Sequence, residues 1–416
     1  MGRLSRRDLL LAGAGAAAAA SLPKRAAARA SRTGWDAVVV GAGVFGAWTA
    51  RRLQEAGQRV LLLDAWGPAH ARASSGGESR MTRGAYGSDE VYTAFALESL
   101  AHWRALSDRA RLPLFHRTGV LFFFGSREPY LEQTMAVHRR LGLPTELLGN
   151  RAMRERFPQI DFAGVEAGVW EPDFGVLMAR RGVQTLVAEL VEAGGTYAQA
   201  AIAPPSADDA PLRRLVSTDG EDFAADRFVF ACGPWLGRLF PDLLATRIFP
   251  TRQEVFFFAP PPGDARFAPQ SLPGWAEFDQ GDIHYGMPDL EGRGFKIAHD
   301  AHGPRVDPDT LERTPSADEL ADVRAYMARR FPVLAGRPLS ESRVCQYENS
   351  SNGDLLIDFH PRWDNVLLVG AGSGHGFKHG PAVGRYAADL LLGRLARPEP
   401  RFSLTTKAEA ENREVH

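Results

Sequence analysis

The chain has 416 residues and a formal net charge of −1, with 44% of its residues hydrophobic and 24% charged. This length favours two domains, and this composition is that of an ordinary globular protein. A near-neutral chain without a long basic block argues against nucleic acid as a partner. No apolar run reaches the roughly 18 residues that suggest a membrane span.

Residues 1–30 are predicted to be an export signal. Ser5–Leu10 reads SRRDLL, a twin-arginine pattern, and a weakly apolar run and small residues follow it. This order is typical of bacterial signal peptides that the twin-arginine (Tat) export machinery recognises. We therefore expect a periplasmic or extracellular protein. The alternative is an alanine-rich tail that takes no part in the fold.

The clearest motif comes next. Asp36–Val40 is predicted to be a strand, Gly41–Gly46 reads GAGVFG, and a helix and a second strand that ends at Asp64 follow. In a GxGxxG turn the first glycine allows the tight turn, the second lets a pyrophosphate approach the backbone, and the third lets helix and strand pack closely. An acid in the position of Asp64 can hold a ribose hydroxyl. The predicted cofactor contacts are Gly41, Gly43, Val44, Phe45, Gly46 and Asp64.

This motif leaves two questions open. The pattern does not separate FAD from NAD, and a glycine-rich turn that binds nothing is the alternative.

The polar loop 72–84 that follows contains Arg80 and Arg83, which one turn of helix would place on the same face. Such a pair can clamp a carboxylate or a phosphate, or can form a solvated basic face.

The centre of the chain mixes helices and strands, and Pro129–Leu141 is predicted to be a short helix. From Pro250 onward the pattern is rich in strands, and Ser316 with Glu319 predicts a capping box for a helix that ends at Arg330. The chain therefore reads as a nucleotide-binding domain that a second, sheet-bearing domain interrupts twice.

The segment from Cys345 to Lys378 carries a second glycine-rich turn. A buried strand, Val366–Val369, leads into Gly370–Gly376. A helix with Pro381 in its first turn is predicted to follow and to include Leu395. A turn of this kind aims backbone N–H groups and the positive end of a helix at an anionic group. The predicted cofactor contacts in this turn are Gly372, Gly374, His375 and Gly376.

The chain has two cysteines, Cys232 and Cys345. Cys232 ends a predicted strand among small residues, which favours a packing role. An exported protein with two cysteines can also form a disulfide. A free Cys345 that faces a bound ligand is the other interpretation, and the spacing alone does not choose between them.

On these motifs the chain resembles the FAD-dependent amine oxidases of the monomeric sarcosine oxidase and N-methyltryptophan oxidase family. The resemblance runs from about Asp36 to Arg394, and its most specific pieces are GAGVFGAWTARRLQEAGQRVLLLDA, ESRMTRGAYG, YGMPDLEGRGFKIA, CQYENSSNGDLLIDFHP and GSGHGFK. It implies an α/β fold with a Rossmann-like FAD-binding domain of the glutathione reductase type, interleaved with an α+β substrate domain that contains a mixed or antiparallel sheet. The expected FAD-binding domain comprises residues 34–119, 176–250 and 350–416, and the expected substrate domain comprises residues 120–175 and 251–349.

The resemblance also implies roles for residues around the flavin. Cys345 stands where the family has the cysteine that carries a thioether to the flavin, so covalently bound FAD is expected. Lys296 matches the lysine that promotes the reaction with molecular oxygen. Arg80 matches the arginine that lies beside the flavin ring.

The substrate site follows in the same way. Arg83 and Lys378 match the two cations that clamp the substrate carboxylate, and Tyr285 and Tyr347 match two tyrosines that line the cavity. The implied activity is oxidation of a secondary or N-methyl amino acid, with hydride transfer to FAD and reduction of oxygen to hydrogen peroxide. The motifs indicate no metal site.

The chain departs from the family pattern in two places. Ser75 and Gly76 stand where the family often has histidines, and Asp300 replaces a family histidine. A sarcosine-specific pocket therefore does not follow from the resemblance. Two alternatives remain: an exported flavin dehydrogenase that acts on a D- or secondary amino acid and passes electrons to a non-oxygen acceptor, and a flavin-binding module without catalytic activity.

Overall fold

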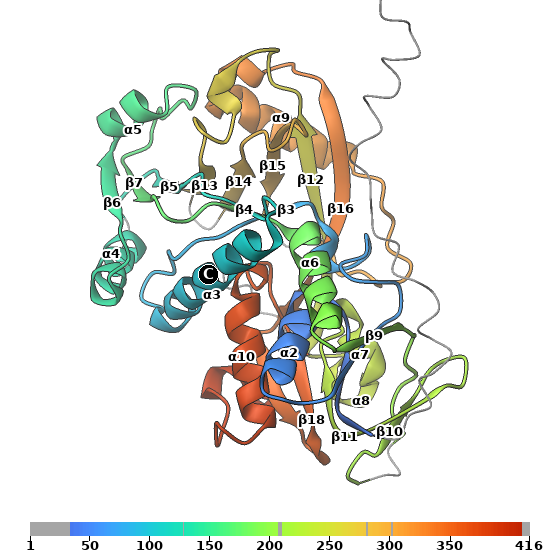
Figure 1. Cartoon of the computed structure of the whole chain (residues 1–416). Coiled ribbons are helices and arrows are strands. Elements are labelled where there is room, and N and C mark those ends of the chain that lie inside the picture. The colour runs from blue at the N-terminus through green and yellow to red at the C-terminus, as the bar shows by residue number, and fades with distance from the viewer. Residues whose placement is uncertain (1–33, 128, 207–209, 280–281, 301–302, 410–416) are drawn as a thin grey trace, which may run out of the picture.

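The computed structural model describes residues 34–127, 129–206, 210–279, 282–300 and 303–409. The predicted export signal therefore lies outside the described residues. The described chain forms two lobes, each built on its own large sheet (Figure 1). Within the described residues, no helix is both long enough and apolar enough to cross a membrane.

The first sheet belongs to the lower lobe of Figure 1 and is mostly parallel. Its central strands are buried runs of valine, leucine and phenylalanine, as expected for a sheet covered on both faces. Only its edge strand β17 and the short β10 pair in the antiparallel direction. In spatial order the strands are β17 (Leu356–His360), β18 (Trp363–Gly370), β11 (Asp222–Phe230), β1 (Trp35–Val40), β2 (Val60–Asp64) and β9 (Thr196–Gln199), with β10 (Arg214–Val216) on β11.

Helices cover one face of this sheet, where α2 and α10 cross closely. A Cβ atom at Gly384 would lie 2.6 Å from the Cβ of Trp48, so only a glycine allows this crossing. Two short helices, α7 and α8, pack on the other face with Phe240 and Leu244. The helices are α2 (Val44–Glu55), α3 (Glu90–Ala110), α6 (Ala179–Glu192), α7 (Leu236–Leu239), α8 (Pro241–Leu244) and α10 (Gly380–Leu391).

The second sheet forms the upper lobe and is mixed: β13 pairs with β5 in parallel, and the other neighbours are antiparallel. Helices α9 (Ala317–Arg330), α5 (Asn150–Arg156) and α4 (Pro129–Leu141) belong to this lobe. The strands in spatial order are β16 (Leu339–Ser350), β12 (Ile248–Phe258), β15 (Phe295–His299), β14 (Asp282–Met287), β13 (Gly274–Asp279), β5 (Val120–Phe124), β7 (Ala167–Glu171) and β6 (Glu146–Gly149).

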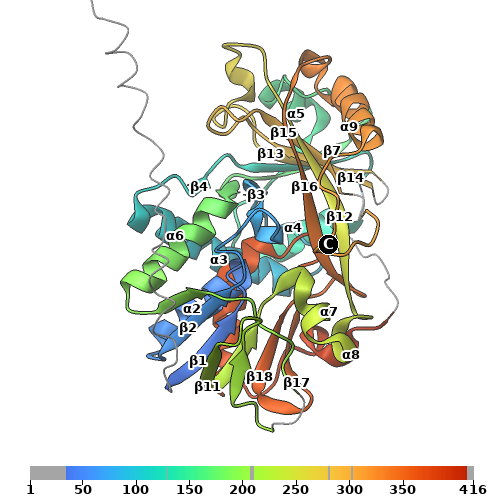
Figure 2. The same cartoon turned by 90° about the vertical axis from the view of Figure 1, so that its right-hand side faces the viewer.

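Two features connect the lobes. The long strands β12 and β16 run from the upper lobe down to the first sheet (Figure 2). A small sheet of β3 (Ser79–Met81), β8 (Val176–Met178) and β4 (Phe115–His116) lies between the lobes.

The predicted fold class is confirmed, and the local predictions need three corrections. Helix α2 starts at Val44, inside the glycine motif, because the motif residues themselves form its first turn. Leu395 lies beyond the end of α10. The capping box is half formed: Ser316 Oγ accepts a hydrogen bond from the Glu319 N–H, but the Ser316 N–H donates to Glu254 at 2.7 Å.

Candidate active site

The glycine turn after β1 leaves room for a ligand at one position. A Cβ atom at Gly41 would collide with the carbonyl oxygen of Ala231, and one at Gly46 would collide with that of Gly41. A Cβ atom at Gly43 would have one atom of the described residues within 4 Å, Ser75 Oγ at 3.5 Å. Gly41 and Gly46 therefore serve packing, while the space above Gly43 is open to an approaching group.

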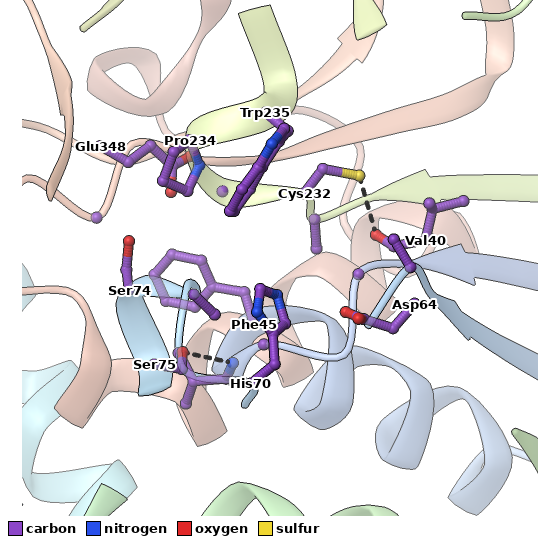
Figure 3. Close-up of a pocket in the computed structure, with 18 of the residues that line it drawn as sticks. Val40, Phe45, Asp64, His70, Ser74, Ser75, Cys232, Pro234, Trp235 and Glu348 are labelled. Atoms are coloured by element: carbon purple, nitrogen blue, oxygen red, sulfur yellow. Dashed lines mark hydrogen bonds between the residues drawn. The ribbon is translucent and has the colours of Figure 1, made fainter. Parts of the chain in front are cut away.

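That open space belongs to a cavity of about 490 Å³. Figure 3 shows Pro234, Trp235 and Glu348 on one side of it and Ser74, Ser75 and Phe45 on the other. Of the predicted cofactor contacts, those that line it are Gly41, Gly43, Val44, Phe45, Asp64, Arg80, Gly372, Gly374 and Gly376. Gly46 lies behind the wall, and His375 and Cys345 line a second cavity.

The start of α2 suits an anionic group. Its N-cap residue, Gly43, has no side chain to cap the helix, and its first turn contains no acidic residue. Ser75 Oγ accepts a hydrogen bond from the Val44 N–H at 3.1 Å. The positive end of the helix therefore faces the cavity, and no acidic side chain in its own first turn competes with a bound anion.

Asp64 closes this end of the cavity. Its Oδ2 accepts a hydrogen bond from the Ala42 N–H at 2.8 Å, and its Oδ1 accepts from the N–H groups of Trp66 and Gly67, each at 2.8 Å. These bonds hold the carboxylate at the end of β2, where an acid contacts the ribose of a dinucleotide. Together, the turn, the free helix end and Asp64 fit the nucleotide part of FAD.

A second cavity of about 110 Å³ adjoins the first. The two share wall residues: Arg80, Tyr347, Ser373, Gly374 and Phe377. The second cavity brings together the predicted substrate residues Arg83, Tyr285, Tyr347 and Lys378 with Cys345. Much of the remaining wall is apolar, with Met81, Phe122, Val255, Ala276, Phe278, Ile283 and Met287.

Two buried cations stand over one aromatic ring in this cavity. The Arg83 guanidinium carbon lies 4.0 Å from the centre of the Tyr86 ring, and Lys378 Nζ lies 5.0 Å from it. Burial lowers the pKa of Lys378 well below its usual value, and the charge of Arg83 lowers it further. An anion bound between the two cations would reverse both effects, so the arrangement favours a carboxylate.

Arg80 and Arg83 do not share a helix face, contrary to the helical interpretation of their spacing. Arg80 belongs to strand β3, and Arg83 follows the strand. Arg80 lines both cavities and donates to the backbone oxygens of Ser79 and Ser74 at 2.8 and 2.7 Å. Arg83 lines only the second cavity, because the extended backbone separates the two side chains.

Lys296 is buried, with 2% of its surface exposed, and lies beside this site without lining either cavity. Its Nζ lies 6.0 Å from the centre of the Tyr285 ring. Burial, and then the charge of Arg80, lowers the pKa of Lys296 to about 7.

Both cysteines are free, which excludes a disulfide between them. Cys345 lines the second cavity. Cys232 has a packing role, as predicted, with its Sγ 3.4 Å from the Val40 carbonyl oxygen, and it also lines the first cavity.

Two buried glutamates were missed from the sequence. Glu171 accepts from the Gly84 N–H at 3.1 Å through both oxygens, and burial raises the pKa of Glu171 to about 7. Glu348 lines the first cavity and accepts from the Ala371 N–H at 2.7 Å, and burial raises the pKa of Glu348 to about 8. For Glu171 the available signal was an acid at the end of an apolar strand, AGVWE. Glu348 lies in the polar segment CQYENS, which gives no such signal.

Comparison with known proteins settles the family. The sequence pattern of the FAD dependent oxidoreductase (DAO) family matches residues 36–390. The chain belongs to this family. It is therefore an FAD-dependent oxidoreductase, and the nucleotide cavity is that of a flavoprotein.

Among its relatives this oxidoreductase is similar to amino acid oxidases over most of its length. It is 30% identical to monomeric sarcosine oxidase of Bacillus sp. (strain B-0618), covering 91% of this chain and 98% of that protein. It is 30% identical to N-methyl-L-tryptophan oxidase of Salmonella heidelberg (strain SL476), covering 89% and 97%. The fold also matches L-proline dehydrogenase from P. horikoshii, with a TM-score of 0.78 at 19% identity over 89% of this chain and 96% of the other.

Proposed function

We propose that this oxidoreductase oxidises a secondary or N-methyl amino acid and passes the electrons to molecular oxygen, forming hydrogen peroxide. The observation that carries the proposal is the pair Arg83 and Lys378 in a small apolar cavity that adjoins the nucleotide cavity. The names of the relatives, sarcosine oxidase and N-methyl-L-tryptophan oxidase, support the same substrate class.

In this proposal the protein positions the substrate. Bound FAD supplies the acceptor for a hydride equivalent from the carbon next to the amine. Arg83 and Lys378 bind the substrate carboxylate and so hold the amine in one orientation. This lowers the entropic cost of reaching the reactive geometry. The cations Arg83 and Lys378 in the same wall disfavour a charged ammonium and so favour the neutral amine that can give up a hydride, whereas Asp300 acts in the opposite direction.

The residues that would hold FAD come from both glycine turns. The start of α2 would face the pyrophosphate, Asp64 would hold the ribose, and Arg80 lies where the two cavities meet. We propose that Cys345 would hold the flavin through a thioether, because it is a free thiol that lines the second cavity. The link would replace the thiol hydrogen and one hydrogen of the flavin, and molecular oxygen would take up the two electrons released. We assign the oxygen reaction to the buried cation Lys296.

Asp300 makes the substrate wall of this chain unusual. It lines the second cavity, and its charge, after burial, raises the pKa of Tyr285. A carboxylate here can accept a hydrogen bond from an amine N–H. Substrates larger than sarcosine, or with a second amino group, therefore belong in any screen.

An anaerobic screen tests the proposal. N-methyl, cyclic and D-amino acids are mixed with the protein, and loss of the yellow flavin absorbance identifies a substrate. Air and a peroxide assay follow. Bleaching with peroxide formation supports an oxidase, and bleaching that only a dye reverses supports the dehydrogenase alternative. If no amine bleaches the flavin, the proposed function is wrong.

We also propose that the chain is exported by the twin-arginine route, on the pattern in Ser5–Leu10. Expression of the full chain in a bacterium with and without the Tat system, followed by fractionation, tests this. Equal periplasmic amounts in both strains would contradict it.

A further inference from the structure

We propose that His284, His299, Glu319 and Asp322 form a binding site for a divalent transition-metal ion of the zinc type, separate from both cavities, with Asp282 as the partner of the second ring nitrogen of His299. Asp282 and His284 belong to β14, His299 ends β15, and Glu319 and Asp322 lie on α9. Side chains alternate along a strand, so Tyr285 faces the second cavity while His284 faces α9. The proposed site therefore lies on the opposite face of the sheet from the substrate residues.

The donor atoms already have spacings that suit a metal. His284 Nε2 lies 3.1 Å from Asp322 Oδ2, and His299 Nδ1 lies 3.2 Å from the same oxygen. Zinc binds nitrogen and oxygen at about 2.0–2.2 Å in a tetrahedron, which places neighbouring donors about 3.3 Å apart.

Further carboxylates complete the donor set. The ligand atoms of Asp282, His284 and His299 lie within 4.8 Å of one another, and so do those of His299, Glu319 and Asp322. Asp322 faces Nδ1 of His299 and Asp282 faces its Nε2, so the ion would lie on the Nδ1 side and Asp282 would hold the ring from its other edge.

The charges in the cluster also favour a cation. Three carboxylates meet two imidazoles. The nearby Arg252 is paired through its Nε with Glu254 at 2.8 Å. A divalent ion would offset the excess negative charge.

His284 is held in place by its neighbours, with its Nε2 3.1 Å from Asp322 Oδ2. Its ring stacks between Tyr326, with centroids 4.0 Å apart, and His299, at 4.4 Å. Asp282 and Asp322 have side chains that are 52% and 45% exposed, so an ion can enter from solvent.

The competing account is a set of ion pairs without metal. His299 has Asp282 at its Nε2 and Asp322 at its Nδ1, an arrangement that a doubly protonated imidazole also satisfies. The two accounts differ in one respect: only the metal site binds zinc tightly and in a defined ratio.

A bound ion would have a consequence for the neighbouring cavity. Tyr285 follows His284 and Asp300 follows His299, and both line the substrate cavity. An ion shared by β14, β15 and α9 would cross-link the strands that position these two side chains. The site therefore has a structural role next to the substrate wall.

The test is a zinc titration of the full, flavin-loaded chain, purified without a polyhistidine tag and treated with a chelator. Calorimetry is expected to give one zinc ion per chain with a dissociation constant of micromolar or below. His299→Gln and Asp322→Asn are each expected to weaken binding at least 100-fold. His116→Gln is the matched control, because His116 also lies next to a carboxylate, Glu291, and should leave binding unchanged.

A second measurement does not depend on variants. X-ray absorption at the zinc edge of the loaded protein should show nitrogen and oxygen neighbours, with imidazole scattering. Sulfur scattering would place the ion at a cysteine and overturn the proposal. Absence of binding, or binding that His299→Gln leaves intact, would also overturn it and would support the ion-pair account.

Discussion

Lys296 Nζ donates a hydrogen bond to the backbone oxygen of Ser79 at 2.9 Å, across 217 positions of the sequence. The bond joins β15 of the upper sheet to β3, one residue before Arg80. A buried lysine is costly unless its charge is used or satisfied. This contact therefore fixes the Lys296 amino group at the junction of the two lobes, close to Arg80 and the place where the cavities meet.

Replacing this cation should separate the two halves of the reaction. Lys296→Met is expected to slow reoxidation by oxygen on the order of 10²–10³-fold, the usual cost of losing one preorganised electrostatic group. Anaerobic reduction by substrate should change far less, and a dye acceptor should restore turnover. Stopped-flow traces of both half-reactions decide the matter. Unchanged reoxidation would exclude Lys296 from the oxygen reaction.

The same lysine predicts a pH dependence. Its pKa is lowered to about 7, so its charged fraction falls as the pH rises through that value. The rate of reoxidation by oxygen should therefore be highest below about pH 7 and should decline above it. Lys296→Arg keeps the charge at all these pH values and should flatten the profile. A profile that is identical in the wild-type protein and Lys296→Arg would assign the titration to another group.

The carboxylate clamp predicts a loss of affinity. Removing one cation from a buried ion pair costs roughly 2–5 kcal/mol. Arg83→Met and Lys378→Met should each weaken binding of a carboxylate inhibitor by a few hundred-fold on that scale. Arg117→Met is the control, because Arg117 pairs with Asp173 on the surface, outside both cavities. Normal inhibitor binding in either cavity variant would remove that residue from the clamp.

The two free cysteines allow a test and a matched control for the proposed covalent link to the flavin. After acid precipitation the wild-type pellet should stay yellow, and Cys345→Ala should release its flavin into the supernatant. Cys232→Ala should keep a yellow pellet, although Cys232 also lines the nucleotide cavity. Colour lost from the wild-type pellet would show that no covalent bond forms.

Glu171 predicts a pH-dependent stability. Its pKa in the folded protein is raised to about 7 from 4.5, mainly by burial. The neutral Glu171 therefore stabilises the folded protein fully below about pH 4.5. This stabilisation, about 3 kcal/mol in the free energy of unfolding, is lost as the pH rises through about 7. Glu171→Gln cannot ionise, so its denaturation midpoint should depend less on pH between 5 and 8. Glu146→Gln, at an exposed position of the neighbouring strand β6, should retain the wild-type slope. An unchanged slope in Glu171→Gln would contradict the assignment.

The sequence predicts those parts of the molecule whose structure depends on residues close together in the chain. The turn Gly41–Gly46 has its strand before it and its helix after it, so neighbouring residues reveal it. Pro129–Leu141 was predicted as a helix and is α4, since its apolar spacing and terminal residues are all within the segment.

The rest depends on contacts between distant segments. Glu348 and Trp235 face the nucleotide cavity only because β16 and the turn after β11 meet there. Glu171 is buried next to Gly84 through a contact over 87 positions, which no local pattern encodes. The interpretation of Arg80 and Arg83 as a helical pair was wrong because β3 pairs with β8, about a hundred residues later.

The position of β18 in the chain has a consequence for synthesis. Its residues Val366–Leu368 pair with Phe228–Phe230 of β11, and the turn that closes the nucleotide cavity follows it. While the ribosome makes the long stretch between these strands, that edge of β11 stays unpaired, and an unpaired edge is a template for association with other chains. Capture of the cofactor therefore follows the end of translation, and a chaperone that shields β11 until then would raise the yield of loaded protein.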